Sequence, residues 1–152
     1  MGTRRLGIFV TLALTLTFVL APSSSAAAAP GGDVRTYALT SDHKTKPLGI
    51  DDRTPSFGWK IRSNERSQAQ SAYRVLVASS RSALAHDDGD MWDSGKVESS
   101  ESLQVTYEGD PLVSRHRYYW KVMVWDASGD AAGWSAPTWF ETGLLDADDW
   151  SA

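Results

Sequence analysis

Residues 118–125 read Tyr-Tyr-Trp-Lys-Val-Met-Val-Trp, and this stretch decides the fold. Every second residue from Tyr118 to Val124 is aromatic or β-branched, and successive side chains of a strand point to opposite faces of a sheet. The stretch is short and rich in residues that favour strands over helices. We therefore expect a strand whose Tyr118, Trp120, Val122 and Val124 face the interior.

The same period of two recurs in three earlier segments. The residues expected to face inward there are Phe57, Trp59 and Ile61, then Tyr73, Val75 and Val77, then Leu103, Val105 and Tyr107. Turn-forming clusters at 51–55, 87–90, 108–111 and 128–130 separate the segments.

The strand count identifies the fold class. With 37–40 as the first strand, 139–142 as the last and 92–97 as a further one, the chain has about seven strands. That number is typical of an antiparallel sandwich of two sheets, of the immunoglobulin or fibronectin type III kind. We predict this all-β fold for residues 35–143, with one helical turn within 79–85.

The first 28 residues have the pattern of a secretory signal peptide. Arg4 and Arg5 precede an apolar run over 6–21, and small residues follow up to Pro30. The apolar run is short for a membrane span, which needs about 20 residues. We expect cleavage after Ala28, a flexible linker over 29–34 and a secreted protein without a membrane anchor. Thr3-Arg4-Arg5 leaves the export route open between general secretion and twin-arginine export.

Composition excludes several classes of partner. Loss of the leader removes two arginines and no acid, which changes the formal net charge from −4 to about −6. A mildly acidic domain without a basic stripe is a poor ligand for nucleic acid or anionic lipid. The chain has no cysteine, so disulfides and thiolate metal sites are excluded.

The titratable residues predict no catalytic, cofactor-binding or metal site. Asp51 and Asp52 are neighbours that would point to opposite faces of an extended chain, and the acidic turn 87–90 offers no apolar pocket. That turn also lacks the spacing of a calcium loop. The histidines are scattered without an i, i+4 pair and are expected in surface loops; they are His43, His86 and His116.

Four aromatic residues form the candidate interaction surface. Tyr119 and Trp125 alternate with the inward set of 118–124, and Trp134 and Trp139 flank the last turn and the last strand. Large exposed apolar residues usually mark interfaces, so we expect this face to pack against a neighbouring domain. The alternative is that the rings stack on sugars.

Leu112 and Tyr118 resemble the tyrosine-corner stretch of fibronectin type III domains, in which a tyrosine hydroxyl bonds backbone upstream of its strand. Trp59 resembles the buried tryptophan between the two sheets of that family. Ser114 stands where this stretch often has proline, so the match is partial.

A narrower resemblance covers nearly all of the chain after the leader. Ordered blocks at 47–51, 55–59, 68–78, 92–97, 118–122 and 140–145, followed by Asp149-Trp150, resemble the N-terminal domain of bacterial α-L-rhamnosidases. In that family of inverting glycoside hydrolases, the acid and the base lie in later domains, and nothing in this chain matches their motifs.

The resemblance implies a non-catalytic accessory module whose expected partners are the downstream domains of the parent enzyme and rhamnose-containing glycans. The tail 144–152 would lead into the next domain, and Asp148 and Asp149 are expected to be frayed there. Two alternatives stay open from the sequence: a free-standing carbohydrate-binding module, and an interaction or spacer module of a cell-surface protein.

Overall fold

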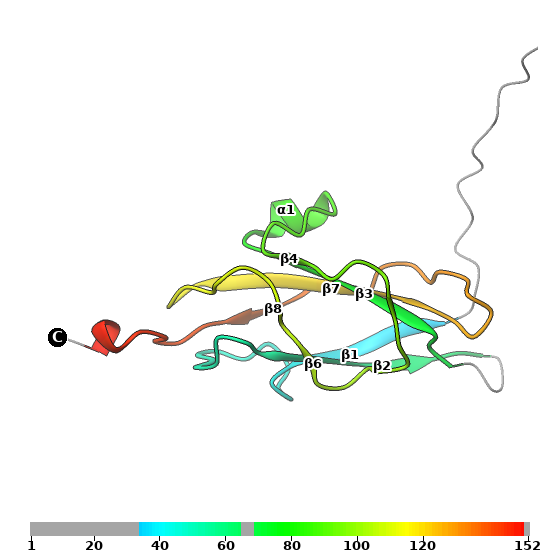
Figure 1. Ribbon diagram of the computed structural model, residues 1–152, viewed down its shortest axis with the longest axis horizontal. Helices are drawn as coiled ribbons and strands as arrows, with labels where there is room; N and C mark the ends of the chain where they lie inside the picture. The colour runs from blue at the N-terminus through cyan, green and yellow to red at the C-terminus, as the bar shows by residue number, and fades with distance from the viewer. Residues whose placement is uncertain (1–33, 65–68, 151–152) are drawn as a thin grey trace, which may run out of the picture.

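The computed structural model describes residues 34–64 and 69–150, and most of its regular secondary structure consists of strands (Figure 1). The predicted signal peptide over 1–28 and the linker up to residue 33 lie outside the described residues. The strands are β1 (Arg35–Ser41), β2 (Ser56–Arg62), β3 (Ala72–Ala78), β4 (Trp92–Asp93), β5 (Val97–Glu98), β6 (Val105–Thr106), β7 (Arg117–Trp125) and β8 (Thr138–Glu141). The helices are α1 (Arg81–Ala85) and the 3₁₀ turn η1 (Ala147–Trp150).

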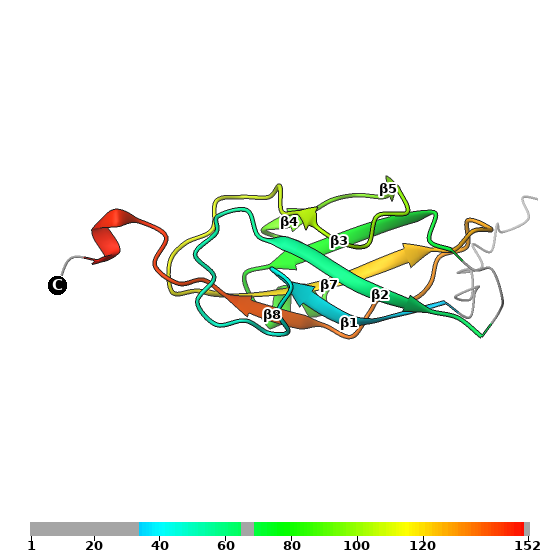
Figure 2. The same cartoon turned by 90° about the horizontal axis from the view of Figure 1, so that it is seen from below.

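The strands form two antiparallel sheets that face each other (Figures 1 and 2). One sheet has the order β1-β2-β6, and the other has the order β4-β3-β7-β8 with β5 also paired to β3. The predicted all-β sandwich is therefore confirmed. The segment expected to form one strand over 92–97 is divided into β4 and β5, because Gly95 turns the chain with φ +62° between them.

The core lies between the sheets and is dominated by aromatic rings. Phe57 of β2 and Trp120 of β7 meet with ring centroids 4.5 Å apart. The indole N–H of Trp59 donates to Oε1 of Gln70 at 2.9 Å, and that of Trp120 donates to Oγ of Ser41 at 3.1 Å. Buried polar groups are thus paired, as a stable interior requires.

The predicted inward residues of β7 are all buried, and Phe57, Trp59, Val75 and Val77 are buried with them. The prediction for Leu103 is wrong, because its side chain is 59% exposed. The strand β6 starts only at Val105, and Gln104 has a left-handed backbone with φ 58°. That residue interrupts the alternation, since only an extended backbone turns successive side chains to opposite faces.

The predicted tyrosine corner is present at the start of β7. The hydroxyl of Tyr118 accepts a hydrogen bond from the backbone N–H of Val113 at 2.9 Å. Leu112 beside it is buried in the core. This hydrogen bond therefore holds the loop between β6 and β7 against the first residues of β7.

The connection between β1 and β2 crosses to the other sheet. Ile50 forms a parallel bridge with Thr142, just after β8. The N–H of Ile50 donates to the carbonyl of Glu141 at 2.8 Å, and the N–H of Gly143 donates to the carbonyl of Ile50 at 2.7 Å. This bridge joins the two sheets at the end of the sandwich from which the chain leaves.

The C-terminal segment up to Trp150 is held against the sandwich, which corrects the expectation that Asp149 is frayed. The carboxylate of Asp149 accepts hydrogen bonds from the hydroxyl of Ser114 and from the N–H of Asp146. Leu145 packs against the main core. Within the described part of the chain, no helix is long and apolar enough to cross a membrane.

Candidate functional site

The four predicted aromatic residues lie on the outside of the β4-β3-β7-β8 sheet or beside it, and all are half-buried. Tyr119 of β7 is the cross-strand partner of Trp139 of β8. Tyr119 also packs with Trp134 against one small apolar cluster. Trp125 lies apart from them at the opposite end of β7. The structure therefore gathers three of the four rings.

A cation lies over each of the four rings. The guanidinium carbon of Arg117 is 4.0 Å from the ring centroid of Trp139, and that of Arg81 is 5.9 Å from the ring of Tyr119. Lys96 lies 5.1 Å from Trp125. Such contacts are worth about 0.5–1 kcal/mol at exposed sites. A sugar that stacks on these faces would first have to displace the cations.

Trp134 has two such neighbours. Its ring centroid lies 4.9 Å from Nζ of Lys121 and 5.8 Å from the guanidinium carbon of Arg74. Arg74 in turn forms a two-point ion pair with Asp93, with N···O distances of 2.8 and 2.6 Å. The side-chain hydrogen bond from Arg74 holds the pKa of Asp93 below its usual value.

The short helix α1 covers the centre of this outer face. Ser80 caps it by accepting the N–H of Ala83 at 3.1 Å, and Leu84 packs on Leu76 and Ala78 of β3. Lys121 is only 7% exposed as a result, although the alternation of β7 points it outward. Its Nζ donates to the carbonyl of Leu84 at 2.7 Å and pairs with Asp87.

Several of the other acids and histidines have structural contacts. Asp90 accepts the N–H of Ser79 at 2.8 Å, and Asp52 accepts the N–H of Thr54 at 2.8 Å. His116 packs edge-on against Tyr118, and Nδ1 of His86 lies 2.8 Å from the carbonyl of Ser82. Across residues 34–64 and 69–150, no group of three or more His, Cys, Asp or Glu side chains could hold a metal ion.

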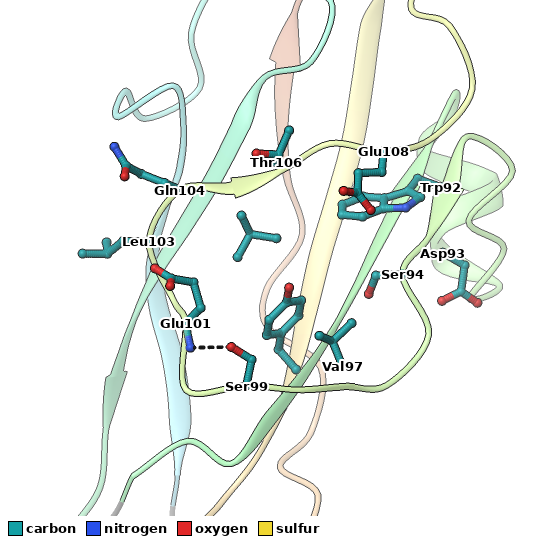
Figure 3. A pocket seen from close by; sticks show the side chains of 12 residues that line it. Trp92, Asp93, Ser94, Val97, Ser99, Glu101, Leu103, Gln104, Thr106 and Glu108 are labelled. Atoms are coloured by element: carbon teal, nitrogen blue, oxygen red, sulfur yellow. Dashed lines mark hydrogen bonds between the residues drawn. The ribbon is translucent and has the colours of Figure 1, made fainter.

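A groove that the sequence did not predict lies at one side of the sandwich. It has a volume of about 540 Å³ and lies at the seam between β6 and the edge strands β4 and β5 (Figure 3). Tyr73 and Trp92 line it together with the exposed carboxylates of Glu101 and Glu108. Burial, followed by the negative charges of Glu108 and Glu101, raises the pKa of the Tyr73 hydroxyl.

The groove offers hydrogen-bond acceptors, but it lacks a side chain suited to act as a general acid. A general acid needs an apolar enclosure that raises the pKa of its carboxyl group, and both glutamates face solvent. No sequence signal could have found the groove, because its walls come from two sheets and from segments without regular alternation.

Residues 36–146 match the family model described as "Rha78A-like, N-terminal immunoglobulin domain". The chain belongs to this family. Its sequence is 48% identical over 119 residues to an α-L-rhamnosidase of Streptomyces avermitilis, which covers 78% of this chain and 11% of that protein. An α-L-rhamnosidase of Formosa agariphila is 47% identical over 107 residues, with coverages of 70% and 11%.

Two solved α-L-rhamnosidase structures contain a domain with the same fold as this chain. The Streptomyces avermitilis α-L-rhamnosidase complexed with L-rhamnose superimposes on 78% of this chain with a TM-score of 0.73 and 48% identity, over 11% of its own length. The α-L-rhamnosidase from Dictyoglumus thermophilum gives a TM-score of 0.75 and 40% identity, with coverages of 78% and 13%. This N-terminal immunoglobulin domain thus spans between 11% and 15% of the length of the curated relatives it matches.

Proposed function

We propose that this immunoglobulin domain is the non-catalytic accessory module of a secreted α-L-rhamnosidase, in which other domains hydrolyse terminal α-L-rhamnose. The observation that carries the proposal is the family match over 36–146, together with the small share of each relative that it occupies. The rest of each relative is large enough to contain the catalytic machinery.

The geometry of the described carboxylates supports this division of labour. An inverting hydrolase holds an acid and a base about 6.5–9.5 Å apart on either side of the glycosidic bond. The carboxylates that line the seam groove are those of Asp93, Glu101 and Glu108, and all three are exposed. Asp93 is also engaged by Arg74. None of the three lies in the apolar enclosure that a general acid needs.

The test is an assay of the purified chain with an aryl α-L-rhamnoside. We expect no turnover above the rate of the buffer. Glu101→Gln and Glu108→Gln serve as matched variants, because they remove the only candidate acids of the groove apart from the paired Asp93. Turnover by the chain that disappears in either variant would contradict the non-catalytic function.

Secretion is a second part of the proposal. It is supported by the leader pattern over 1–28, in which an apolar run separates two arginines from a tract of small residues. Expression in a secreting bacterial host should release a soluble protein whose first residue is Ala29. Mass spectrometry of the culture medium checks this, and a chain retained at the membrane with Met1 intact would contradict it.

Carbohydrate binding by the outer rings is the alternative function. The cations over Tyr119, Trp125, Trp134 and Trp139 disfavour it, because a stacked sugar would compete with them. Titration of the chain with L-rhamnose and rhamnose-containing oligosaccharides, followed by tryptophan fluorescence, separates the two functions. Saturable binding at millimolar ligand that is lost in Trp139→Ala would favour the alternative over an accessory or spacer module.

A further inference from the structure

The tail of the domain is anchored on both sides of Leu145. Its N–H donates to Oγ of Ser114 at 2.7 Å, and its carbonyl accepts a hydrogen bond from Nη2 of Arg53 at 2.7 Å. Ser114 lies just before β7 and Arg53 lies just before β2, so both sheets contribute to the anchor. The segment 144–150 is therefore attached to the sandwich at Leu145.

Charged groups extend this anchor into η1. Arg53 forms an ion pair with Asp146, and the hydroxyl of Ser114 donates to the carboxylate of Asp149. The same carboxylate accepts the N–H of Asp146 at 3.2 Å. The hydrogen bond from Ser114 lowers the pKa of Asp149, because it stabilises the charged form of the carboxylate. We call Arg53, Ser114, Asp146 and Asp149 the tail clamp.

Large apolar side chains are exposed around the clamp. Leu48 is 70% exposed, Val113 is 57% exposed and Trp150 is 72% exposed. The carbonyl of Pro47 accepts the N–H of Glu141 at 3.0 Å, and the carbonyl of Val113 accepts the hydroxyl of Thr142 at 2.6 Å.

Leu48 and Val113 therefore flank the end of β8, from which the tail departs. The loops that carry them lie at the same end of the sandwich as η1 (Figures 1 and 2). We call Leu48, Val113 and Trp150 the exit pole. Apolar side chains that gather at one end of a soluble domain mark an interface more often than isolated ones do.

We infer that the tail clamp makes residues 144–150 a rigid connector, and that the exit pole is the docking face for the domain that follows in a longer α-L-rhamnosidase polypeptide. The inference rests on the proposed function. The relatives are many times longer than their matched segments, and two of the three exit-pole residues flank the end of β8, from which the tail departs. A domain attached there has a high effective concentration at this face. A partner that is not covalently attached lacks this high effective concentration.

The first test measures the clamp in the 152-residue chain by amide hydrogen exchange. The Leu145 amide should be protected, and Ser114→Ala should speed its exchange at least tenfold while the amides of β3 stay protected. Ser128→Ala is the matched control, because this exposed loop serine lies away from the tail. Exchange of Leu145 at the rate of an unstructured peptide in the unmutated chain would overturn the rigid connector.

The second test joins the chain to the part of the Streptomyces avermitilis α-L-rhamnosidase that follows its matched segment. Peptides over 108–116 and 144–150 should exchange several-fold more slowly in this fusion than in the separate chain. The groove segment 94–104, which carries the exposed Leu103, should not change. The double variant Val113→Ser, Trp150→Ser should remove the gain. Equal exchange at the exit pole in both proteins would overturn the docking face.

Two further readouts separate the possible failures. Light scattering of the separate chain that shows a dimer, lost in Trp150→Ser, would make a second copy the occupant and would also overturn the inference. Hydrolysis of an aryl α-L-rhamnoside by the separate chain bears on the proposed function alone. An unprotected exit pole in an active fusion contradicts only the docking face, whereas turnover by the separate chain contradicts only the non-catalytic accessory function.

Discussion

The two faces of β7 carry similar side chains but are stabilised in different ways. On the inner face, Trp120 is completely buried, touches Phe57 and donates its indole N–H to Ser41. On the outer face, Tyr119 is half-buried beneath a cation, and Lys121 is buried by a helix. The alternation of a strand therefore assigns each side chain to a face, while the element that covers the face sets the energy of the contact.

The largest expected effect is on the inner face. Trp120→Ala should lower the free energy of unfolding by about 3–5 kcal/mol, because it leaves a cavity between the sheets and removes the partner of Ser41. A domain without disulfides has little stability in reserve. Urea denaturation followed by far-ultraviolet circular dichroism measures the change. A loss below about 1 kcal/mol would show that the two faces do not differ as described.

Lys121 tests whether the covered part of the outer face behaves like a core. Lys121→Ala should cost about 2 kcal/mol, because it removes a buried stem that packs beneath α1 and beside Trp134. Lys121→Met should change the free energy of unfolding by less than about 1 kcal/mol, since a buried charge can often be replaced by an apolar side chain of similar length. Thermal unfolding of both variants checks this. Equal losses would show that the charge, and not the packing, stabilises this position.

The outer-face rings that lie under a cation but not under α1 should contribute less to stability. Trp139→Ala should cost about 1 kcal/mol or less, because Arg117 and partial burial are all that it loses. Trp125→Ala is the matched variant at the other end of β7, with Lys96 as the cation. Both are measured by the same urea titration as Trp120→Ala. A cost above 3 kcal/mol for either one would remove the contrast between the faces.

The smallest expected effect concerns pH. The hydrogen bond from Arg74 holds the pKa of Asp93 below its usual value of 3.8. A carboxyl group whose pKa is lower in the folded state stabilises that state above the unfolded value and loses this contribution as pH falls through the folded value. The stability advantage of the unmutated chain over Asp93→Asn should be a few tenths of a kcal/mol at pH 6.

That advantage should shrink below about pH 4 and vanish by about pH 2. Melting temperatures of the two proteins across this range check it, and Asp88→Asn is the control because Asp88 is an exposed neighbour in the 87–90 turn. A difference between the unmutated chain and Asp93→Asn that grows toward low pH would reverse the predicted sign.

Prediction from sequence succeeded where the alternation of side chains along one strand decides which side chains are buried. Phe57, Trp59, Val75 and Trp120 were placed in the core by alternation, and Tyr118 was placed at a corner by the resemblance of its stretch to fibronectin type III domains. The prediction failed at Leu103, because the backbone turns at Gln104 before the strand begins.

The candidate site was predicted only in part. Alternation placed Tyr119 and Trp125 on the outer face, but it could not show that cations cover the rings. Lys121 was expected to face outward, and it does so, but α1 buries it. The sequence did not predict the groove or the tail clamp. No local pattern shows that Glu101 and Glu108 line one groove, or that Arg53 and Ser114 both contact the tail.

The sequence by itself determined the two-sheet sandwich, the composition of its interior and the resemblance to the N-terminal domain of α-L-rhamnosidases, because strand periodicity and turn residues are local properties of the chain. Only the tertiary structure decided which outward side chains are covered, where the two sheet edges leave a groove, and how the tail is held. Those features depend on contacts between residues far apart in sequence, such as Arg53 with Leu145, whose partners are chosen by the packing of the whole domain.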